Sequence, residues 1–152
     1  MAIISKLELT NKNYINWCQK NDARHISVIL KNEIELHNFY IPAGGDEPDV
    51  SINPKFEHKI SFLNEMHKYF LKDTRLKKIL LGDLNIAPLE NDVWSHKQLL
   101  NVVSHTPIET ETLLKIIDTG AWIDVMREFV PHNEKLYSWW SYRNRNWELS
   151  NR

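Results

Sequence analysis

The segment from Asn53 to Phe70 constrains the fold most, because it joins a helix start to a one-sided apolar pattern. Asn53 has a side chain suited to capping a helix, and Pro54 fits the first helical position. Beyond them, apolar residues recur at steps of three or four: Phe56, Ile60, Leu63, Met66 and Phe70. This spacing predicts an amphipathic helix with a single apolar face.

Strands are predicted on both sides of this helix. Residues 25–31 are rich in β-branched and apolar side chains, residues 31–33 supply a turn, and residues 34–40 alternate. The alternation predicts a hairpin in which one face carries Ile34, Leu36, Asn38 and Tyr40. Residues 78–81 predict a short buried strand that ends at Gly82.

A second helix is predicted from Thr106 to Gly120, because Thr106–Glu109 has the T-x-x-E pattern of a capping box with proline in the first turn. Residues 137–142 predict a last strand, and the apolar residues 1–4 indicate one more. Because strands and helices interleave, the predicted fold class is α/β or α+β. The length of 152 residues favours a single domain over residues 1–152.

The composition excludes several classes of protein. The 19 basic and 20 acidic residues give a formal net charge of −1, unlike the strongly basic coat of many nucleic-acid-binding proteins. With 42% hydrophobic and 26% charged residues the chain is of the globular type, and it has no apolar stretch long enough to span a membrane. Cys18 is the single cysteine and has no disulfide partner within the chain, so we expect a reducing, cytoplasmic location.

Candidate catalytic groups follow the strand predicted at residues 78–81. Asp83 and Asn85 are two positions apart, so on an extended segment both side chains point toward one spot at the edge of the sheet. A carboxylate accepts a proton or binds a hard cation, and an amide binds a phosphoryl oxygen or the cation. The alternative is a turn in which both side chains bond the local backbone. Tyr40 ends its strand beside a Pro-Gly loop, where it points either into a cleft or onto the edge of the core.

An aromatic cluster at residues 137–142 precedes Arg143 and Arg145. Such a cluster stacks on sugars or bases while the arginines hold phosphates, or it forms a buried strand with an exposed basic tail. The seven histidines have no metal-ligand spacing, and we interpret them as solvated or internally hydrogen-bonded. The sequence has no nucleotide-binding glycine loop, no G-x-S-x-G motif and no C-x-x-C motif.

Five segments carry a further pattern. They are the N-x-Y-x-P segment Asn38–Pro42, the G-D-x-N-x-x-P segment Gly82–Pro88, the segment Gly120–Arg127 with Asp124, the S-W-x-x-Y-R segment Ser138–Arg143, and Asn151–Arg152. In this order they resemble the exonuclease III and apurinic-apyrimidinic (AP) endonuclease family of the endonuclease–exonuclease–phosphatase superfamily. The resemblance implies two facing β-sheets covered by helices, a four-layer αββα sandwich. The chain would carry the central portion of this sandwich, without its first and last strands.

The resemblance also implies an activity, namely metal-dependent hydrolysis of DNA in base-excision repair by an AP endonuclease or 3′–5′ exonuclease. By matching motif positions, Tyr40 contacts the scissile phosphate, Asp83 readies the attacking water, and Asn85 binds the phosphate. Asp83 and Asn85 are then the ligands of Mg²⁺ or Mn²⁺. The implied substrate is double-stranded DNA with abasic sites or 3′ ends, and its implied contacts are Asn38, Trp139 and Arg143.

Parts of the family's pattern have no match in this sequence. The family's metal-binding glutamate precedes the segment that matches residues 2–4, and its closing Ser-Asp-His triplet occurs nowhere in the chain. We therefore expect weak metal binding by this chain. Two alternatives to an active nuclease stay open. One is an inactive fragment, or one half of a split gene product that acts beside a complementary chain, and the other is a superfamily phosphatase.

Overall fold

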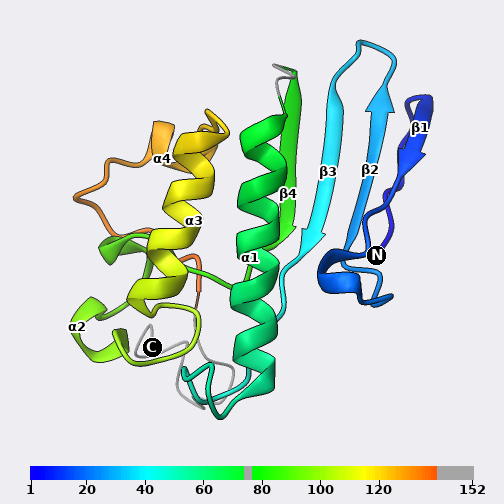
Figure 1. Cartoon of the computed structure of the whole chain (residues 1–152). Helices are drawn as coiled ribbons and strands as arrows, with labels where there is room; N and C mark the ends of the chain where they lie inside the picture. The colour runs from blue at the N-terminus through cyan, green and yellow to red at the C-terminus, as the bar shows by residue number, and fades with distance from the viewer. Residues whose placement is uncertain (74–76, 140–152) are drawn as a thin grey trace.

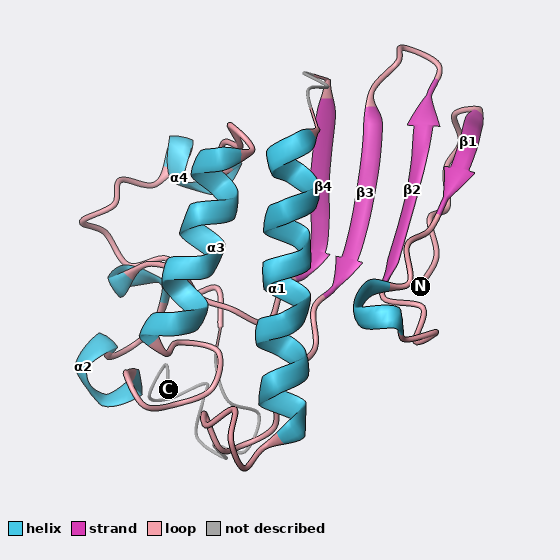
Figure 2. Cartoon of the chain, in the orientation of Figure 1, coloured by secondary structure: helices cyan, strands magenta, loops and turns pink. Residues whose placement is uncertain are grey.

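The computed structural model describes residues 1–73 and 77–139, which form one mixed sheet with helices on one of its faces (Figure 1). The strands lie in the order β1-β2-β3-β4, and Figure 2 shows α1 beside the sheet with α3 next to it. The elements are β1 (Leu9–Asn13), β2 (His25–Leu30), β3 (Glu35–Tyr40), α1 (Pro54–Lys72), β4 (Lys78–Asp83), α2 (His96–Leu99), α3 (Pro107–Thr119), α4 (Val125–Phe129) and the 3₁₀ turns Trp17–Gln19 and Glu90–Asp92.

The sheet is antiparallel except at its last strand. β2 and β3 form the predicted hairpin, in which His25 pairs with Phe39 and Ile29 with Glu35. β4 pairs with β3 in parallel, and α1 forms the crossover that a parallel pair requires. The predicted hairpin and the α/β class are therefore confirmed.

Both predicted helices are confirmed as well. α1 begins at Pro54, and the Asn53 side chain accepts a hydrogen bond from the Lys55 backbone N–H at 3.0 Å. α3 follows the Thr106–Glu109 capping box and ends just before Gly120. The apolar faces of both helices meet the chain around β3 in the main core, whose members include Phe39, Ile41, Phe56, Phe62, Leu63, Met66, Phe70, Leu113 and Ile116.

The two faces of the sheet differ in exposure. On the face that meets the helices, His37 and Phe39 are each 0% exposed. On the opposite face Tyr40 is 43% exposed, and Ile79 and Leu81 are each 44% exposed. The strand predicted at residues 78–81 is present, but the prediction that it is buried is wrong for the described residues, because helices cover only one side of it. These residues supply one sheet and its helical cover, out of the four layers that the resemblance implies.

β4 also runs two residues beyond its predicted end. Gly82 does not end the strand but pairs with Phe39, and the strand continues to Asp83. The Gly82 φ is +131°, and a Cβ atom there would lie 1.9 Å from the Phe39 carbonyl oxygen. No other residue fits this position unless the backbone moves, so the glycine serves a close approach of two strands.

Two other predicted strands need correction. Residues 1–4 form no strand, since no strand of the described sheet pairs with them, and the Asn38 Nδ2 donates to the Ala2 carbonyl oxygen at 3.1 Å. Residues 137–139 are irregular too, while the rest of that predicted strand lies outside the described residues. Short apolar runs without a sustained period do not distinguish a strand from a loop. None of the described helices is long and apolar enough to cross a membrane.

Candidate active site

The register of β3 and β4 brings Tyr40 and Asp83 side by side. The two residues are paired across the parallel ladder at the carboxyl ends of their strands. Residues paired in this way project to the same face of a sheet, which here is the exposed one. Ligands of α/β proteins bind outside the carboxyl ends of parallel strands, so the pair occupies a position suited to a binding site.

Asn85 ties the two strand ends together. Its Nδ2 donates to the Ile41 carbonyl oxygen at 3.0 Å, and its backbone N–H donates to Asp83 Oδ1 at 3.1 Å. Its φ is +51°, in the left-handed region that asparagine tolerates better than most residues. The local Asx bond that sequence reasoning offered as an alternative is present, but it uses only part of the acceptor capacity of a carboxylate. Because Nδ2 faces Ile41, the Asn85 Oδ1 is turned away from it.

A cavity of about 660 Å³ adjoins this site. Asp83 and Asn85 line it together with Trp139 and with Asp124, whose side chain caps α4 by accepting from the Met126 backbone N–H at 3.1 Å. Most of the other lining side chains are apolar, and they include residues of β4, α3 and α4. The structure thus brings Trp139 to the same cavity as Asp83 and Asn85.

The remaining predicted residues lie elsewhere. Asn38 and Tyr40 share the exposed face of β3 but do not line the cavity, and Arg143 lies outside the described residues. Arg24, which sequence reasoning missed, has its guanidinium carbon 5.0 Å from the centre of the Tyr40 ring, and its Nη1 donates to the Tyr40 carbonyl oxygen at 3.2 Å. The hairpin register alone places it there, because the Tyr40 N–H bonds the Arg24 carbonyl oxygen.

A buried lysine and a buried histidine donate hydrogen bonds to the backbone of residues 85–87, the segment that follows β4. Lys59 Nζ donates to the Asn85 carbonyl oxygen at 2.7 Å, and His105 Nδ1 donates to the Ala87 carbonyl oxygen at 2.7 Å. Burial lowers the pKa of Lys59, an effect that the nearby carboxylate of Glu109 opposes, and burial also lowers the pKa of His105. A sequence signal for Lys59 existed, since it lies within the apolar stripe of α1, three residues after Phe56.

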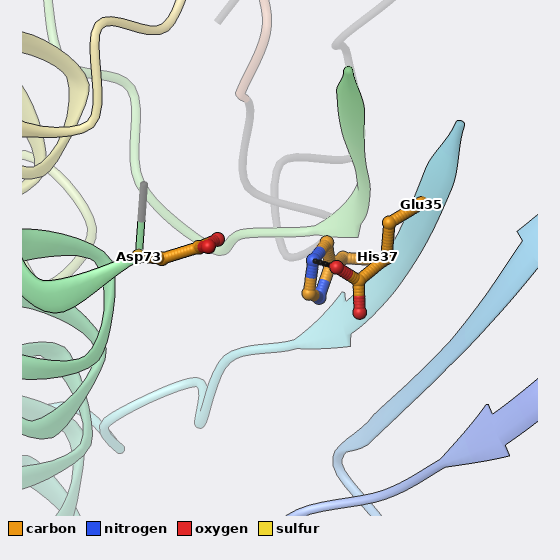
Figure 3. Close-up of side chains that lie close together, drawn as sticks. All are labelled: Glu35, His37 and Asp73. Atoms are coloured by element: carbon orange, nitrogen blue, oxygen red, sulfur yellow. Dashed lines mark ion pairs between the residues drawn. The ribbon is translucent and has the colours of Figure 1, made fainter. Parts of the chain in front are cut away.

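A group of potential metal ligands lies at the opposite end of β3. Glu35 and His37 on β3 face Asp73 at the end of α1, and their ligand atoms lie within 4.8 Å of one another (Figure 3). His37 Nε2 is 3.5 Å from Glu35 Oε2, and Lys78 Nζ is 3.4 Å from Asp73 Oδ2. Since an ammonium group already neutralises charge here, we interpret the cluster as a network of ion pairs. Sequence spacing does not reveal it, because Asp73 is far from His37 along the chain.

Curated proteins share sequence with this chain, whereas no family model matches it. An exodeoxyribonuclease of Bacillus subtilis (strain 168) is 31% identical over 90 residues, which are 59% of this chain and 35% of the relative. The DNA repair nuclease APEX1 of Danio rerio is 31% identical over 83 residues, 51% of this chain and 26% of the relative. This chain is related to the exonuclease III and AP endonuclease family. It spans about a third or less of the length of these relatives.

Solved structures share the fold of this chain. An AP endonuclease from Archaeoglobus fulgidus superposes with a TM-score of 0.80 at 25% identity, over 95% of this chain and 55% of that one. A 3′ phosphatase, NExo (D146N), from Neisseria bound to a product DNA hairpin superposes with the same TM-score at 20% identity, over 95% and 55% of the two chains. The family resemblance and the fold predicted from the sequence motifs are thereby confirmed.

Proposed function

We propose that Tyr40, Asp83 and Asn85 form part of an active site that hydrolyses DNA phosphodiester bonds in base-excision repair. The observation that carries the proposal is the parallel pairing of Tyr40 with Asp83, with Asn85 bonded across the two strand ends. The names of the relatives, an exodeoxyribonuclease and an AP endonuclease, support the substrate class. The proposed substrate is double-stranded DNA with abasic sites or 3′ ends.

Each side chain has a role that its chemistry supports. The exposed Asp83 carboxylate orients a water molecule and accepts its proton as the water oxygen attacks phosphorus in line. The Asn85 amide and the Tyr40 hydroxyl bind phosphoryl oxygens and stabilise the charge that develops there. The bond to the opposite sugar oxygen breaks, and that oxygen takes up a proton as it leaves.

Asp83 and Asn85 would also hold Mg²⁺ or Mn²⁺, because both side chains offer hard oxygen ligands. Such an ion would supply charge neutralisation at the phosphate. Within residues 1–73 and 77–139, Asp83 belongs to no group of three or more histidine, cysteine or acidic side chains placed to share a metal. Water, the phosphate and a complementary chain are therefore proposed to supply the remaining ligands, and binding by this chain alone is weak.

The exposed face of the sheet is the proposed binding surface for that complementary chain. Ile79 and Leu81 are each 44% exposed on it, next to the Tyr40–Asp83 pair. A chain that covered these apolar side chains would also bring further groups to the phosphate. Asn38, Trp139 and Arg143 are the proposed DNA contacts. A cytoplasmic location is proposed from the single cysteine of the sequence.

The activity test is cleavage, in Mg²⁺, of a labelled duplex with one abasic site. This chain is mixed with the part of the Archaeoglobus fulgidus AP endonuclease that it does not cover. Cleavage is expected to stop in EDTA and to fall by about 10²–10³ in Asp83→Asn. Asp118→Asn, an exposed position on α3, is the matched control and should leave cleavage unchanged.

A second measurement needs no turnover. The chain alone is titrated with Mg²⁺ and a short abasic duplex while its amide NMR signals are followed. The signals of Tyr40, Asp83 and Asn85 should shift together. Cleavage that survives Asp83→Asn, or shifts confined to other parts of the chain, would contradict the proposed site.

A further inference from the structure

A lysine lies deep in the core beside the candidate site. The Lys59 side chain on α1 is 0% exposed. Its Nζ lies 2.5 Å from Glu109 Oε1, 2.7 Å from the Asn85 carbonyl oxygen, 3.3 Å from the Ala43 carbonyl oxygen and 3.4 Å from Ser104 Oγ. An ammonium group has three N–H donors, and four acceptors lie within hydrogen-bond distance of this one.

Glu109 is held in place independently of Lys59. Its carboxylate, also 0% exposed, accepts from the Ser104 N–H at 2.9 Å, the Thr106 N–H at 3.1 Å and Thr106 Oγ1 at 2.6 Å. These groups lie at the start of α3, where the helix dipole favours a negative charge. The carboxylate therefore fixes the ammonium group from one side, and the other donors of Lys59 face the loops that follow β3 and β4.

Those two loops carry the candidate site. The backbone N–H of Asn85 is bonded to Asp83, and its side-chain Nδ2 is bonded to Ile41. The bond from Lys59 holds its carbonyl oxygen, so three polar groups of one left-handed residue are each fixed by a different partner. The bond from Lys59 to Ala43 adds the loop after β3.

Stability alone is a weak explanation for this ion pair. Burying two charges removes their hydration, and apolar residues of similar size often stabilise a core equally well. An apolar pair at these positions would keep the packing but lose the bonds to Asn85 and Ala43. We propose that Lys59, held by Glu109, is a positioning residue that fixes Asn85, and through it Asp83, in the geometry of the site. This inference rests on the proposed function only for the cleavage assay, because the NMR and unfolding measurements need no catalysis.

The first test uses the unmodified chain. A buried ammonium group that donates to carbonyl oxygens exchanges its protons slowly, so Lys59 Nζ should give a ¹H–¹⁵N signal and a coupling to the Asn85 carbonyl carbon. Lys55, which is exposed on the same helix, is the internal control and should give neither. A rapidly exchanging Lys59 ammonium group without that coupling would overturn the proposal.

The second test separates positioning from stability. Lys59→Met alone leaves the Glu109 charge buried without its partner, so Lys59→Met/Glu109→Gln is the informative variant, with Lys55→Met as the matched control. The double variant should unfold at a denaturant concentration close to that of the control, while its Asn85 side-chain amide signal shifts and broadens. In the cleavage assay with the complementary part, kcat should fall roughly 10²-fold because the site is misplaced. KM should stay within about twofold, as for an interaction made in the transition state alone.

The outcomes distinguish this proposal from the proposed function. A stable double variant with an unchanged Asn85 signal means that the ion pair is only structural, which overturns the positioning role. A changed Asn85 signal supports that role even where the unmodified protein does not cleave DNA, and in that case only the proposed function fails. If the double variant does not fold, the Lys59 ammonium signal of the unmodified chain and its coupling to Asn85 decide whether the positioning role holds.

Discussion

One buried histidine should make the stability of this chain fall steeply in mild acid. His25 is 2% exposed, its ring centre lies 4.4 Å from that of Phe39, and its Nε2 lies 3.1 Å from His37 Nδ1. Burial, with a smaller contribution from the neighbouring His37, lowers the pKa of His25 from 6.5 to about 4. The folded chain therefore resists a proton that the unfolded chain accepts.

The sign and size follow from proton linkage. Between pH 6.5 and pH 4 the unfolded chain binds more protons at His25 than the folded chain does, so the free energy of unfolding decreases as the pH falls. The difference between a pKa of 6.5 and one of about 4 is worth about 3 kcal/mol when complete, of which about 2 kcal/mol is lost by pH 5. Below the folded-state pKa this contribution no longer changes.

The assay is urea unfolding at pH 7.5, 6.0 and 5.0 for the unmodified chain and for His25→Phe, which keeps an aromatic ring but does not titrate. Burial lowers the pKa of His58 and His105 too, so only the difference between the two proteins isolates His25. His132→Phe, at an exposed position, is the matched control for loss of an imidazole. An equal pH dependence in His25→Phe and the unmodified chain would refute the reasoning.

Three further outcomes test other parts of the structure. Calorimetry with Mg²⁺ should find no tight site, because Asp83 has no neighbouring carboxylate cluster among the described residues, and a micromolar site abolished by Asp83→Ala would contradict this. Phe39→Ala, at a position 0% exposed, should lower the free energy of unfolding by about 3–5 kcal/mol, whereas Phe129→Ala, at a position 79% exposed, should change it by at most about 0.5 kcal/mol in urea unfolding. Gly82→Ala should unfold at clearly lower urea concentration, because its Cβ would meet the Phe39 carbonyl oxygen, and unchanged stability would disprove that close approach.

The helices and the hairpin were predictable because their signals are local. Asn53 caps α1, and the capping box of α3 and the turn after β2 act within a few residues. The buried face of β3 was not predictable in this way, because its alternation defines two faces without saying which one is covered. Glu35 and His37 lie on the covered face, where the His37 ring meets the rings of His25 and Phe70. Contacts between segments that are distant in the sequence determine which face of β3 is covered.

The candidate site, too, was predictable where the signal is local and not where it depends on contacts between distant segments. Motif positions identified Tyr40, Asp83 and Asn85, but the pairing of Tyr40 with Asp83 depends on the register between two strands that a helix separates. Lys59 was missed because its place within the apolar stripe does not show by itself which acceptors its ammonium group would meet. Arg24 was missed because its position beside Tyr40 follows only from the folded hairpin.

The geometry of the site and its affinity for metal are set by different parts of the protein. Gly82 allows β4 to approach β3, the left-handed Asn85 turns the chain back toward Ile41, and Lys59 holds the Asn85 carbonyl oxygen. All of these contacts lie within the described residues, so this chain by itself can hold the groups that we propose to bind phosphate in position. A tight metal site needs more carboxylates than Asp83 alone, and none shares a ligand cluster with Asp83 among the described residues. Changes at Lys59 should therefore alter the Asn85 signal without altering Mg²⁺ affinity, whereas a complementary chain should raise Mg²⁺ affinity and leave the bonds of Asn85 as they are.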